Sequence, residues 1–483
     1  RKMKKSHASI CAWDLLFLPG QKKAASGRLA SVACRRVKVS ALYKCIEWLV
    51  EYVPMDNGVD PSLQSELLRF NDELRGNILR SPEYESGRLS PGRPGDPHDQ
   101  PRRRSNVLRD SQVPAIYVFG DSTADVGNNN YLTGAAVPRA NFPHNGIDFP
   151  TSRPTGRFSN GYNGVDFLGH AIFFLSVGTV WDGDWEIMPK YDNDHNILQP
   201  LSALNMGFRR SPPPFLAVAN KTSNPLFRGL QGTNFASAGS GILDSTGQSI
   251  IPMSKQVQQF AAVQRNISAR ISQQAADTVL SRSLFLISTG GNDIFAFFSA
   301  NSTPSSAEMQ RFVANLVSLY TNHVKDLYVL GARKFAVIDV PPIGCCPYPR
   351  SLHPLGACID VLNELARGLN KGVKDAMHGL SVSFSGFKYS IGSSHAVVQS
   401  IMKHPQRLGF KEVTTACCGS GKFNGESGCT PNATLCDNRH DYLFWDLLHP
   451  THATSKIAAA AIYNGSLRFA APINFRQLVD DQH

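Results

Sequence analysis

Short apolar runs and longer helix-like segments alternate from residue 113 onward, and this alternation constrains the fold more than any other feature. The runs at 115–119, 284–288 and 335–340 are typical of buried strands, because each is short and is followed by turn residues. Segments with helical periodicity lie between and after them, at 308–330, 361–378, 395–403 and 451–467. Strands that alternate with helices predict an α/β fold, in which helices cover both faces of a mainly parallel sheet.

The residues before this pattern differ in composition. Residues 86–112 are rich in Pro, Gly, Arg and Asp, which is typical of a linker. The first 112 residues hold 20 Lys and Arg against 13 Asp and Glu, so they carry most of the net charge of +11. We interpret 1–112 as a solvated, poorly ordered basic leader and expect no nucleic-acid partner. The predicted organisation is this leader, a globular domain at 113–470 and a tail at 471–483.

Ten cysteines occur, three in the leader and seven late in the chain. The late ones are Cys345, Cys346, Cys358, Cys417, Cys418, Cys429 and Cys436. None has metal-site spacing with nearby histidines, so we expect no metal and no cofactor. Their position in Gly- and Pro-rich segments favours disulfides formed in an oxidising compartment. Because seven is an odd number, at least one of them is free or pairs elsewhere.

Targeting signals in the sequence are weak. Asn-x-Ser/Thr sequons, which support secretion only weakly, occur at Asn220, Asn266, Asn301, Asn432 and Asn464. No segment has the roughly 18–20 apolar residues of a transmembrane helix. The basic start at 1–5 is followed by an apolar stretch that Asp14 interrupts, so no convincing signal peptide is present.

The segment Phe119-Gly120-Asp121-Ser122-Thr123 ends the first predicted strand. Gly120 permits a tight turn, and Ser122 stands where the next helix would begin, at a carboxyl strand end where α/β proteins bind ligands. A helix N-terminus at this point would favour developing negative charge. Alone, Gly-Asp-Ser is a weak signal, because most such tripeptides are turns or helix caps. It also lacks the Gly-x-Ser-x-Gly pattern of a nucleophile elbow.

A carboxylate and an imidazole follow near the C-terminus. Asp446 and His449 stand three residues apart in the segment 444–450. A serine hydroxyl becomes a good nucleophile when a base takes its proton; histidine is the usual base, and a carboxylate fixes its tautomer. Asp446 could orient His449 from within one loop. Alone, the pair would equally suit a helix-start Asp beside an incidental His.

Two further loops carry hydrogen-bond donors. Asn292 lies directly after the strand predicted at 284–288, and its side-chain amide can donate to an oxyanion. The segment 234–241 is a run of mainly small residues, which lets a backbone N–H approach a ligand closely. Each of these segments alone is a plausible turn.

The order of these segments resembles the four signature blocks of the SGNH hydrolases. Ser122, Gly239, Asn292 and His449 follow one another in the order of that family. Five separate segments are similar to those of the plant GDSL esterase/lipase family: 119–130, 156–161, 341–345, 417–419 and 446–451. The resemblance extends over about three quarters of the chain, roughly 113–467. It is specific because all five segments agree in order.

This resemblance implies a three-layer α/β/α, flavodoxin-like fold with a central five-stranded sheet. It also implies a secreted, monomeric serine hydrolase of carboxylic esters. Ser122 would attack the acyl carbon, His449 would take its proton and Asp446 would orient His449. The expected substrates are lipid-like, small-molecule or cell-wall esters.

The resemblance further implies an oxyanion hole. Its donors would be the N–H groups of Ser122 and Gly239 and the side chain of Asn292, each typically worth about 3–4 kcal/mol. Gly241 is the rival to Gly239, because the sequence does not fix the register of that loop. Asp121 and Asp293 flank the site, and we expect structural roles for them.

Two regions depart from the family pattern. Members usually begin with a signal peptide shortly before the serine block, whereas 112 unmatched residues precede it here. Residues 169–202 form a non-family insertion, because joining 165–168 directly to 203–208 would give a family-like passage. Our hypothesis is that both regions come from a mis-assembled gene model, which peptides from 169–202 in the native protein would rule out. The functional alternative is that 169–202 forms a lid over the acyl site.

Two other functions remain open at this point. An acyltransferase with the same catalytic residues would use an alcohol in place of water. A non-catalytic binding protein could also use this scaffold, since a fold does not fix function. The presence of all four signature residues disfavours that second alternative.

Overall fold

The central sheet is built from five parallel strands and one antiparallel edge strand. The computed structural model describes residues 113–169, 211–219 and 232–481; the predicted leader and nearly all of the predicted insertion lie outside them. The strand order is β10-β5-β4-β3-β1-β2. These strands are β1 (Ile116–Gly120), β2 (Gly232–Asn234), β3 (Leu284–Ser288), β4 (Lys334–Ile338), β5 (Lys388–Gly392) and β10 (Ala470–Ala471).

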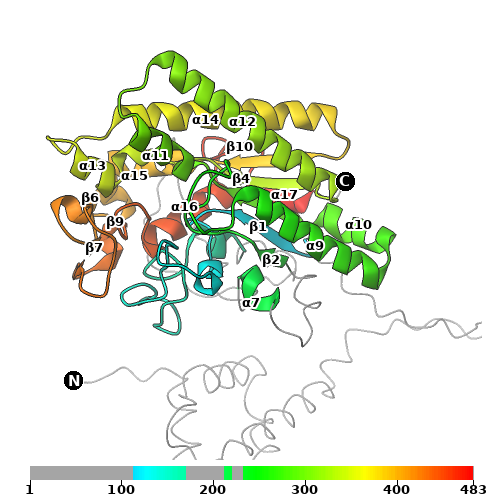
Figure 1. Cartoon of the computed structure of the whole chain (residues 1–483), viewed down its shortest axis with the longest axis horizontal. Coiled ribbons are helices and arrows are strands. Elements are labelled where there is room, and N and C mark those ends of the chain that lie inside the picture. Colours follow the sequence, from blue (N-terminus) through cyan, green and yellow to red (C-terminus); the bar gives the residue numbers. More distant parts are fainter. Residues whose placement is uncertain (1–112, 170–210, 220–231, 482–483) are drawn as a thin grey trace, which may run out of the picture. The chain divides into compact units, whose positions relative to one another are not determined.

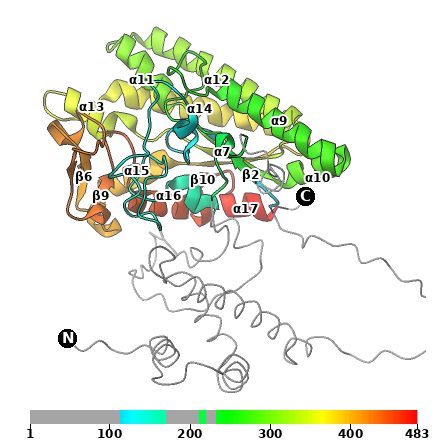
Figure 2. The same cartoon turned by 60° about the horizontal axis from the view of Figure 1, so that its bottom comes forward.

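Helices cover both faces of this sheet, which gives the three-layer architecture that the sequence predicts (Figures 1 and 2). One face is covered by α9 (Met253–Ile271), α10 (Gln273–Arg282), α11 (Gly291–Ala300), α12 (Ser306–Val329) and α14 (Asp360–Ser383). The opposite face is covered by a helix at 164–169, α16 (His452–Asn464) and α17 (Phe475–Asp480). No helix among the described residues is long and apolar enough to cross a membrane.

Strand β1 shows why the strands of this sheet have continuous apolar sequences. Tyr117 and Phe119 point into the core under α9, while Ile116 and Val118 join the core under α16 and α17. Because both faces are covered, every position of the strand is buried and no polar residue alternates with the apolar ones. β1 pairs in parallel with β2 and β3, so the carboxyl ends of these strands lie at one edge of the sheet.

Smaller elements complete the described part of the chain. They are α7 (Phe215–Ala219), α13 (Pro347–Leu352), α15 (Ser394–Lys403), β6 (Glu412–Ala416), β7 (Cys418–Gly419), β8 (Thr434–Leu435) and β9 (Tyr442–Phe444). Three disulfides brace them, Cys345–Cys358, Cys417–Cys436 and Cys418–Cys429. Cys346 is free and buried. The late cysteines thus form disulfides and leave one thiol, as the odd number requires.

The strand and helix predictions agree well with the structure. The predicted strands correspond to β1, β3 and β4, and the predicted helices to α12, α14, α15 and α16, with boundaries that differ by a few residues. The sheet has the five expected parallel strands, to which β10 adds an antiparallel sixth. The short strands β2 and β10 gave no signal that periodicity could detect.

The prediction of a tail after residue 470 is wrong for 471–481. Residue 471 lies in β10, which pairs with β5, and α17 buries Phe475, Leu478 and Val479 completely. These side chains belong to the same apolar core as Ile116 and Val118. A two-residue strand and a six-residue helix are too short to show a hydrophobic period, which is why the sequence suggested a tail.

Candidate active site

The turn after β1 holds Ser122 at the carboxyl edge of the sheet. Gly120 has φ of 143°, and a Cβ atom there would lie 2.0 Å from the carbonyl oxygen of Ser288, so only glycine fits. The N–H of Asp121 donates to that same carbonyl at 3.1 Å. Gln256 of α9 binds both the N–H and the C=O of Gly120. The ends of β1 and β3 are therefore fixed together, with Ser122 partly exposed beside them.

Asp121 ties this turn to β3. Its carboxylate accepts hydrogen bonds from the N–H (2.9 Å) and the hydroxyl (2.7 Å) of Thr123. The Thr123 hydroxyl is also 2.9 Å from the Ser288 hydroxyl. Burial raises the pKa of Asp121 to about 6, although the bonds from Thr123 act in the opposite direction. These contacts agree with the structural role that we expected for Asp121.

A short loop between β9 and α16 carries Asp446 and His449. Trp445 at its start is completely buried, and its indole N–H donates to Asn145 at 2.9 Å. The N–H of Trp445 also donates to the carbonyl of His449 at 2.7 Å, which closes the loop. The Thr451 side chain then caps α16 by accepting from the N–H of Thr454. The loop is therefore held from within and at both ends.

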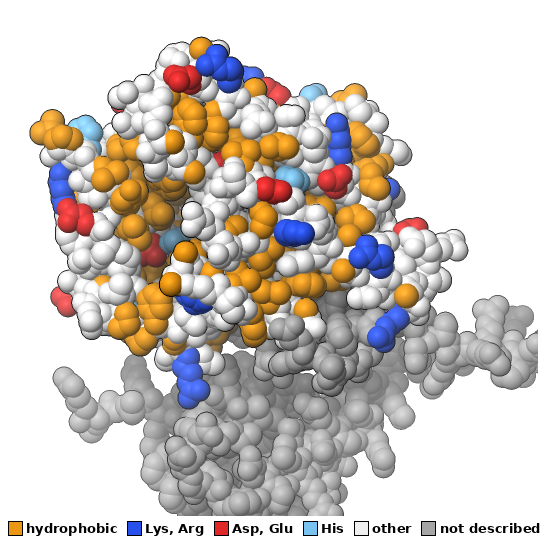
Figure 3. All heavy atoms as spheres, viewed as in Figure 1, with side chains coloured by type: hydrophobic (Ala, Val, Ile, Leu, Met, Phe, Trp, Pro, Cys, Tyr) orange, Lys and Arg blue, Asp and Glu red, His pale blue; other side chains and the backbone are white. Residues whose placement is uncertain are grey.

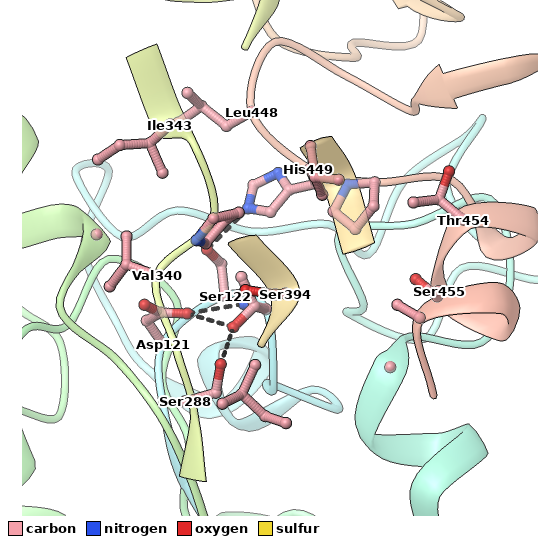
Figure 4. Close-up of a pocket in the computed structure, with 18 of the residues that line it drawn as sticks. Asp121, Ser122, Ser288, Val340, Ile343, Ser394, Leu448, His449, Thr454 and Ser455 are labelled. Carbon is pink, nitrogen blue, oxygen red and sulfur yellow. Dashed lines mark hydrogen bonds between the residues drawn. The ribbon is translucent and has the colours of Figure 1, made fainter. Parts of the chain in front are cut away.

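Ser122, His449 and Asp446 form one hydrogen-bonded chain. Figure 4 shows the Ser122 and His449 side chains facing each other in this chain. Nε2 of His449 lies 2.7 Å from Oγ of Ser122, although the two residues are 327 positions apart. Nδ1 of His449 lies 2.8 and 2.9 Å from the two carboxylate oxygens of Asp446. The predicted nucleophile, base and acid are thus brought together. A protonated Nδ1 facing the carboxylate leaves the Nε2 lone pair facing the serine hydroxyl.

Two environmental effects act on His449 in opposite directions. Burial alone would lower its pKa, because a charged imidazolium loses its hydration. The adjacent Asp446 carboxylate outweighs burial, and Asp121 adds to its effect, so the pKa of His449 is raised above the ordinary 6.5. The ring also packs against Phe158, with 4.9 Å between centroids. His449 is therefore oriented by a carboxylate on one side and an aromatic ring on another.

Asn292 stands at the start of α11 and lines the same cavity as Ser122. Its side-chain amide donates to the carbonyl of Ser240 at 2.8 Å, which uses one of its two hydrogens and leaves the other for a ligand. This bond also anchors the loop that contains the two candidate glycines. Asp293 holds the same loop, since its carboxylate accepts from the N–H groups of Ile242 and Leu243. That contact agrees with the structural role expected for Asp293.

Gly239 and Gly241 differ in their surroundings. Gly241 is buried against Asp293, where an added Cβ would lie 2.4 Å from a carboxylate oxygen. Gly239 is partly exposed and has φ of 86°, a conformation that favours glycine. Neither glycine is among the described residues that line the cavity around Ser122. The structure thus places Asn292 in the same cavity as Ser122. The loop of Gly239 is joined to this site by the Asn292–Ser240 bond and by the bond from the Ser240 hydroxyl to the carbonyl of Gly120.

A cavity with mostly apolar walls opens at Ser122. The space-filling view shows a hollow lined by hydrophobic side chains on the face drawn (Figure 3). Around Ser122 the walls include Phe295, Ile343 and Leu448, and the cavity continues along α16. No cluster of three or more His, Cys, Asp or Glu side chains that could hold a metal occurs in the described part of the chain.

Sequence reasoning missed several residues of this cavity. Thr289, Ser455 and Asp339, which follows β4, all line it. Thr289 directly follows the strand predicted at 284–288, so its position at a strand end was the available signal. Ser455 lies in mid-helix, where a single hydroxyl carries no sequence signal.

The sequence matches the family described as GDSL-like Lipase/Acylhydrolase over residues 116–462. The chain belongs to this family. GDSL esterase/lipase At5g55050 of Arabidopsis thaliana is 32% identical over 377 residues, covering 76% of this chain and 90% of that protein. GDSL esterase/lipase LTL1 of the same plant is 34% identical over 370 residues, covering 74% and 89%.

Membership makes this GDSL protein a carboxylic-ester hydrolase, as its resemblance to the family predicted. The match begins at the first residue of β1 and ends within α16. It therefore includes both the turn of Ser122 and the loop of Asp446 and His449.

Proposed function

We propose that this GDSL hydrolase cleaves acyl esters through a covalent acyl-enzyme on Ser122. The single observation that carries the proposal is the hydrogen-bonded chain from Ser122 through His449 to Asp446. Such a chain activates a hydroxyl that is otherwise a poor nucleophile. The partial exposure of Ser122 to a cavity, with its two partners buried behind it, supports the same assignment.

The reaction follows from this geometry in two halves. His449 Nε2 accepts the proton of Ser122 Oγ as that oxygen attacks the acyl carbon. The imidazolium, stabilised by Asp446, then gives the proton to the departing alcohol, and the acyl group stays on Ser122. Water enters, His449 takes a proton from it, and the resulting oxygen attacks the acyl-enzyme. The proton passes back to Ser122 Oγ as the acid is released.

The oxyanion of each tetrahedral intermediate needs hydrogen-bond donors beside the acyl carbon. We assign this role to the side chain of Asn292 and to the N–H groups of Ser122 and Gly239. No hydrogen bond within the described residues uses either of these N–H groups, which supports the assignment. The close packing of Gly241 on Asp293 favours Gly239 as the glycine donor.

The substrate class and the location follow from more general features. The described lining of the cavity is mostly apolar and includes no Lys or Arg, which suits an uncharged, lipid-like or small-molecule ester. Three disulfides among the described residues favour an oxidising compartment, so we propose that the enzyme is extracellular. We also propose that it acts as a monomer.

Covalent labelling tests the nucleophile assignment. A fluorophosphonate probe should label the purified wild-type protein at Ser122, and peptide mass spectrometry should place the label there. Ser122→Ala should not react, whereas Thr123→Ala, a neighbour outside the proton path, should react. An unreactive wild type, or equal labelling of Ser122→Ala, would show that Ser122 is not the nucleophile.

A further inference from the structure

One wall of the cavity is formed by α16, which begins just after His449. Ser455, Ala458 and Ala459 line the cavity along this helix, and Ile462 lines it one turn further on. Gly164 and Leu168, on the helix at 164–169, line it as well. Small residues on α16 leave open space beside the sheet. From Ser455 to Ile462 this wall extends for roughly 10 Å along the helix axis.

A buried hydroxyl in this wall has no partner. Ser455 is only 3% exposed, and no hydrogen bond to its Oγ exists among the described residues. The hydroxyl groups of Thr123, Ser394 and Thr454, which line the same cavity, all have partners. Figure 4 shows Ser455 on α16, across the pocket from Asp121 and Ser288. A buried hydroxyl without a partner is unfavourable, because it has lost its hydrogen bonds to water.

Thr289 also has an unpartnered, buried hydroxyl in the cavity. It lies in the short loop between β3 and α11, three residues before Asn292, and so belongs to the part of the cavity next to the reacting ester group. Ser455 belongs to a different element, α16, and lies farther along the cavity wall. It is therefore the residue that can distinguish one ester from another.

The surroundings of Ser455 define the chemistry of its partner. Leu168, Ala459 and Ile462 are almost completely buried, so this part of the cavity suits an apolar chain. Asp339 also lines the cavity, and its carboxylate already accepts hydrogen bonds from the Ser393 hydroxyl and the N–H of His395. It therefore does not need a positively charged substrate group as a partner. Its negative charge would repel a negatively charged one. A buried apolar wall suits the group that stays on Ser122 after the alcohol has left.

We propose that the α16 wall binds the acyl group of the substrate, and that Ser455 hydrogen-bonds an uncharged oxygen substituent on it. The substrate class is thus an ester whose acyl chain is apolar but carries a hydroxyl or oxo group near Ser455. This proposal rests on the proposed function, because it takes Ser122 as the point of acyl attachment.

The test compares methyl octanoate with the methyl esters of octanoic acids that carry one hydroxyl at carbons 3 to 8. The rate of hydrolysis is measured from the protons that the reaction releases. For at least one position, the wild type should give a kcat/KM about tenfold above that for methyl octanoate, which is typical of one hydrogen bond to a buried group. In Ser455→Ala, the ratio of kcat/KM for this hydroxylated ester to kcat/KM for methyl octanoate should fall to about 1.

Tyr463→Phe provides a matched control. Its hydroxyl is also buried and unpartnered and lies on the same helix, but Tyr463 is not among the described residues that line the cavity. This variant should keep the preference of the wild type. A preference that survives in Ser455→Ala, or a wild type that favours methyl octanoate over every hydroxylated ester, would overturn the proposal.

Protection from fluorophosphonate labelling separates this inference from the proposed function. Non-hydrolysable methyl ketones, with and without the hydroxyl, replace the esters. The hydroxylated ketone should protect Ser122 better in the wild type but not in Ser455→Ala. Equal protection by both ketones would overturn the role of Ser455 and leave Ser122 as the nucleophile. A wild type that neither labels nor hydrolyses any ester would instead contradict the proposed function.

Discussion

Replacing Asp446 with Asn should lower kcat/KM for a simple ester by about 10³–10⁴-fold while the protein stays folded. The Asp446 side chain accepts hydrogen bonds from two backbone groups, the N–H of Leu448 at 2.9 Å and the N–H of His449 at 2.8 Å. Both bonds go to Oδ1, and the amide oxygen of Asn can accept them equally well. The loop should therefore keep its shape.

The loss of activity arises from a change in the protonation of the His449 ring. With its oxygen held by the two backbone groups, the Asn amide presents its NH₂ to Nδ1 of His449. Nδ1 thereby loses the carboxylate oxygen at 2.9 Å and gains an N–H donor in its place, which favours the tautomer protonated at Nε2, the nitrogen that lies 2.7 Å from Ser122 Oγ. A protonated Nε2 cannot take the serine proton. The expected loss in kcat/KM is typical of catalytic triads in which an Asp→Asn substitution leaves the histidine in the wrong tautomer.

The assay is steady-state hydrolysis of p-nitrophenyl butyrate at pH 8, with the melting temperature measured beside it. Asp437→Asn is the matched control, because Asp437 is exposed and close in sequence, and it should retain the activity of the wild type. An Asp446→Asn variant within tenfold of the wild type, in a protein that Ser122→Ala inactivates, would refute the reasoning. So would a large fall in melting temperature, because the activity loss would then reflect unfolding.

Three further predictions concern titration, charge burial and packing. The kcat/KM should fall as pH decreases through a value above 6.5, because only neutral His449 can accept a proton and its paired carboxylate raises its pKa; an acid limb centred below 6 would contradict this. Arg157→Leu should cost about 3–5 kcal/mol in urea unfolding, because Asp166 is fully buried and loses its ion pair; a loss below 1 kcal/mol would show that other donors suffice. Gly241→Ala should lower the free energy of unfolding by about 1–3 kcal/mol, since its Cβ would overlap the Asp293 carboxylate; unchanged thermal unfolding would show that the loop can shift.

Much of the fold was predictable because the strands are buried on both faces. Continuous apolar runs at β1, β3 and β4 are unusual outside a covered parallel sheet, and long amphipathic helices between them leave few other arrangements. β10 and α17 could not be predicted in this way. β10 is placed by its pairing with β5, and α17 is placed by the burial of Phe475. Both are tertiary contacts, which the sequence of a short segment does not indicate.

The candidate site was predictable to a different degree in each of its parts. Ser122, Asp446 and His449 carry signals because their chemistry needs particular residue types at fixed points of the chain. Gly239 was less certain, since its role depends on the register of a loop, which the contacts of Asn292 and Asp293 determine. The residues of the cavity wall were not predictable, because any apolar helix face looks the same in sequence.

The two halves of the hydrogen-bonded chain are assembled in physically different ways. The Asp446–His449 pair is built within one loop, whose closing bond joins Trp445 to His449 and whose buried indole packs among two disulfides. The contact between His449 and Ser122 instead depends on the sheet, because β1 and the β9–α16 loop meet only in the folded domain. Local structure thus fixes the tautomer of the base, and the tertiary fold delivers the nucleophile to it. A change that disturbs the sheet should therefore separate Ser122 from its base before it disturbs the base itself.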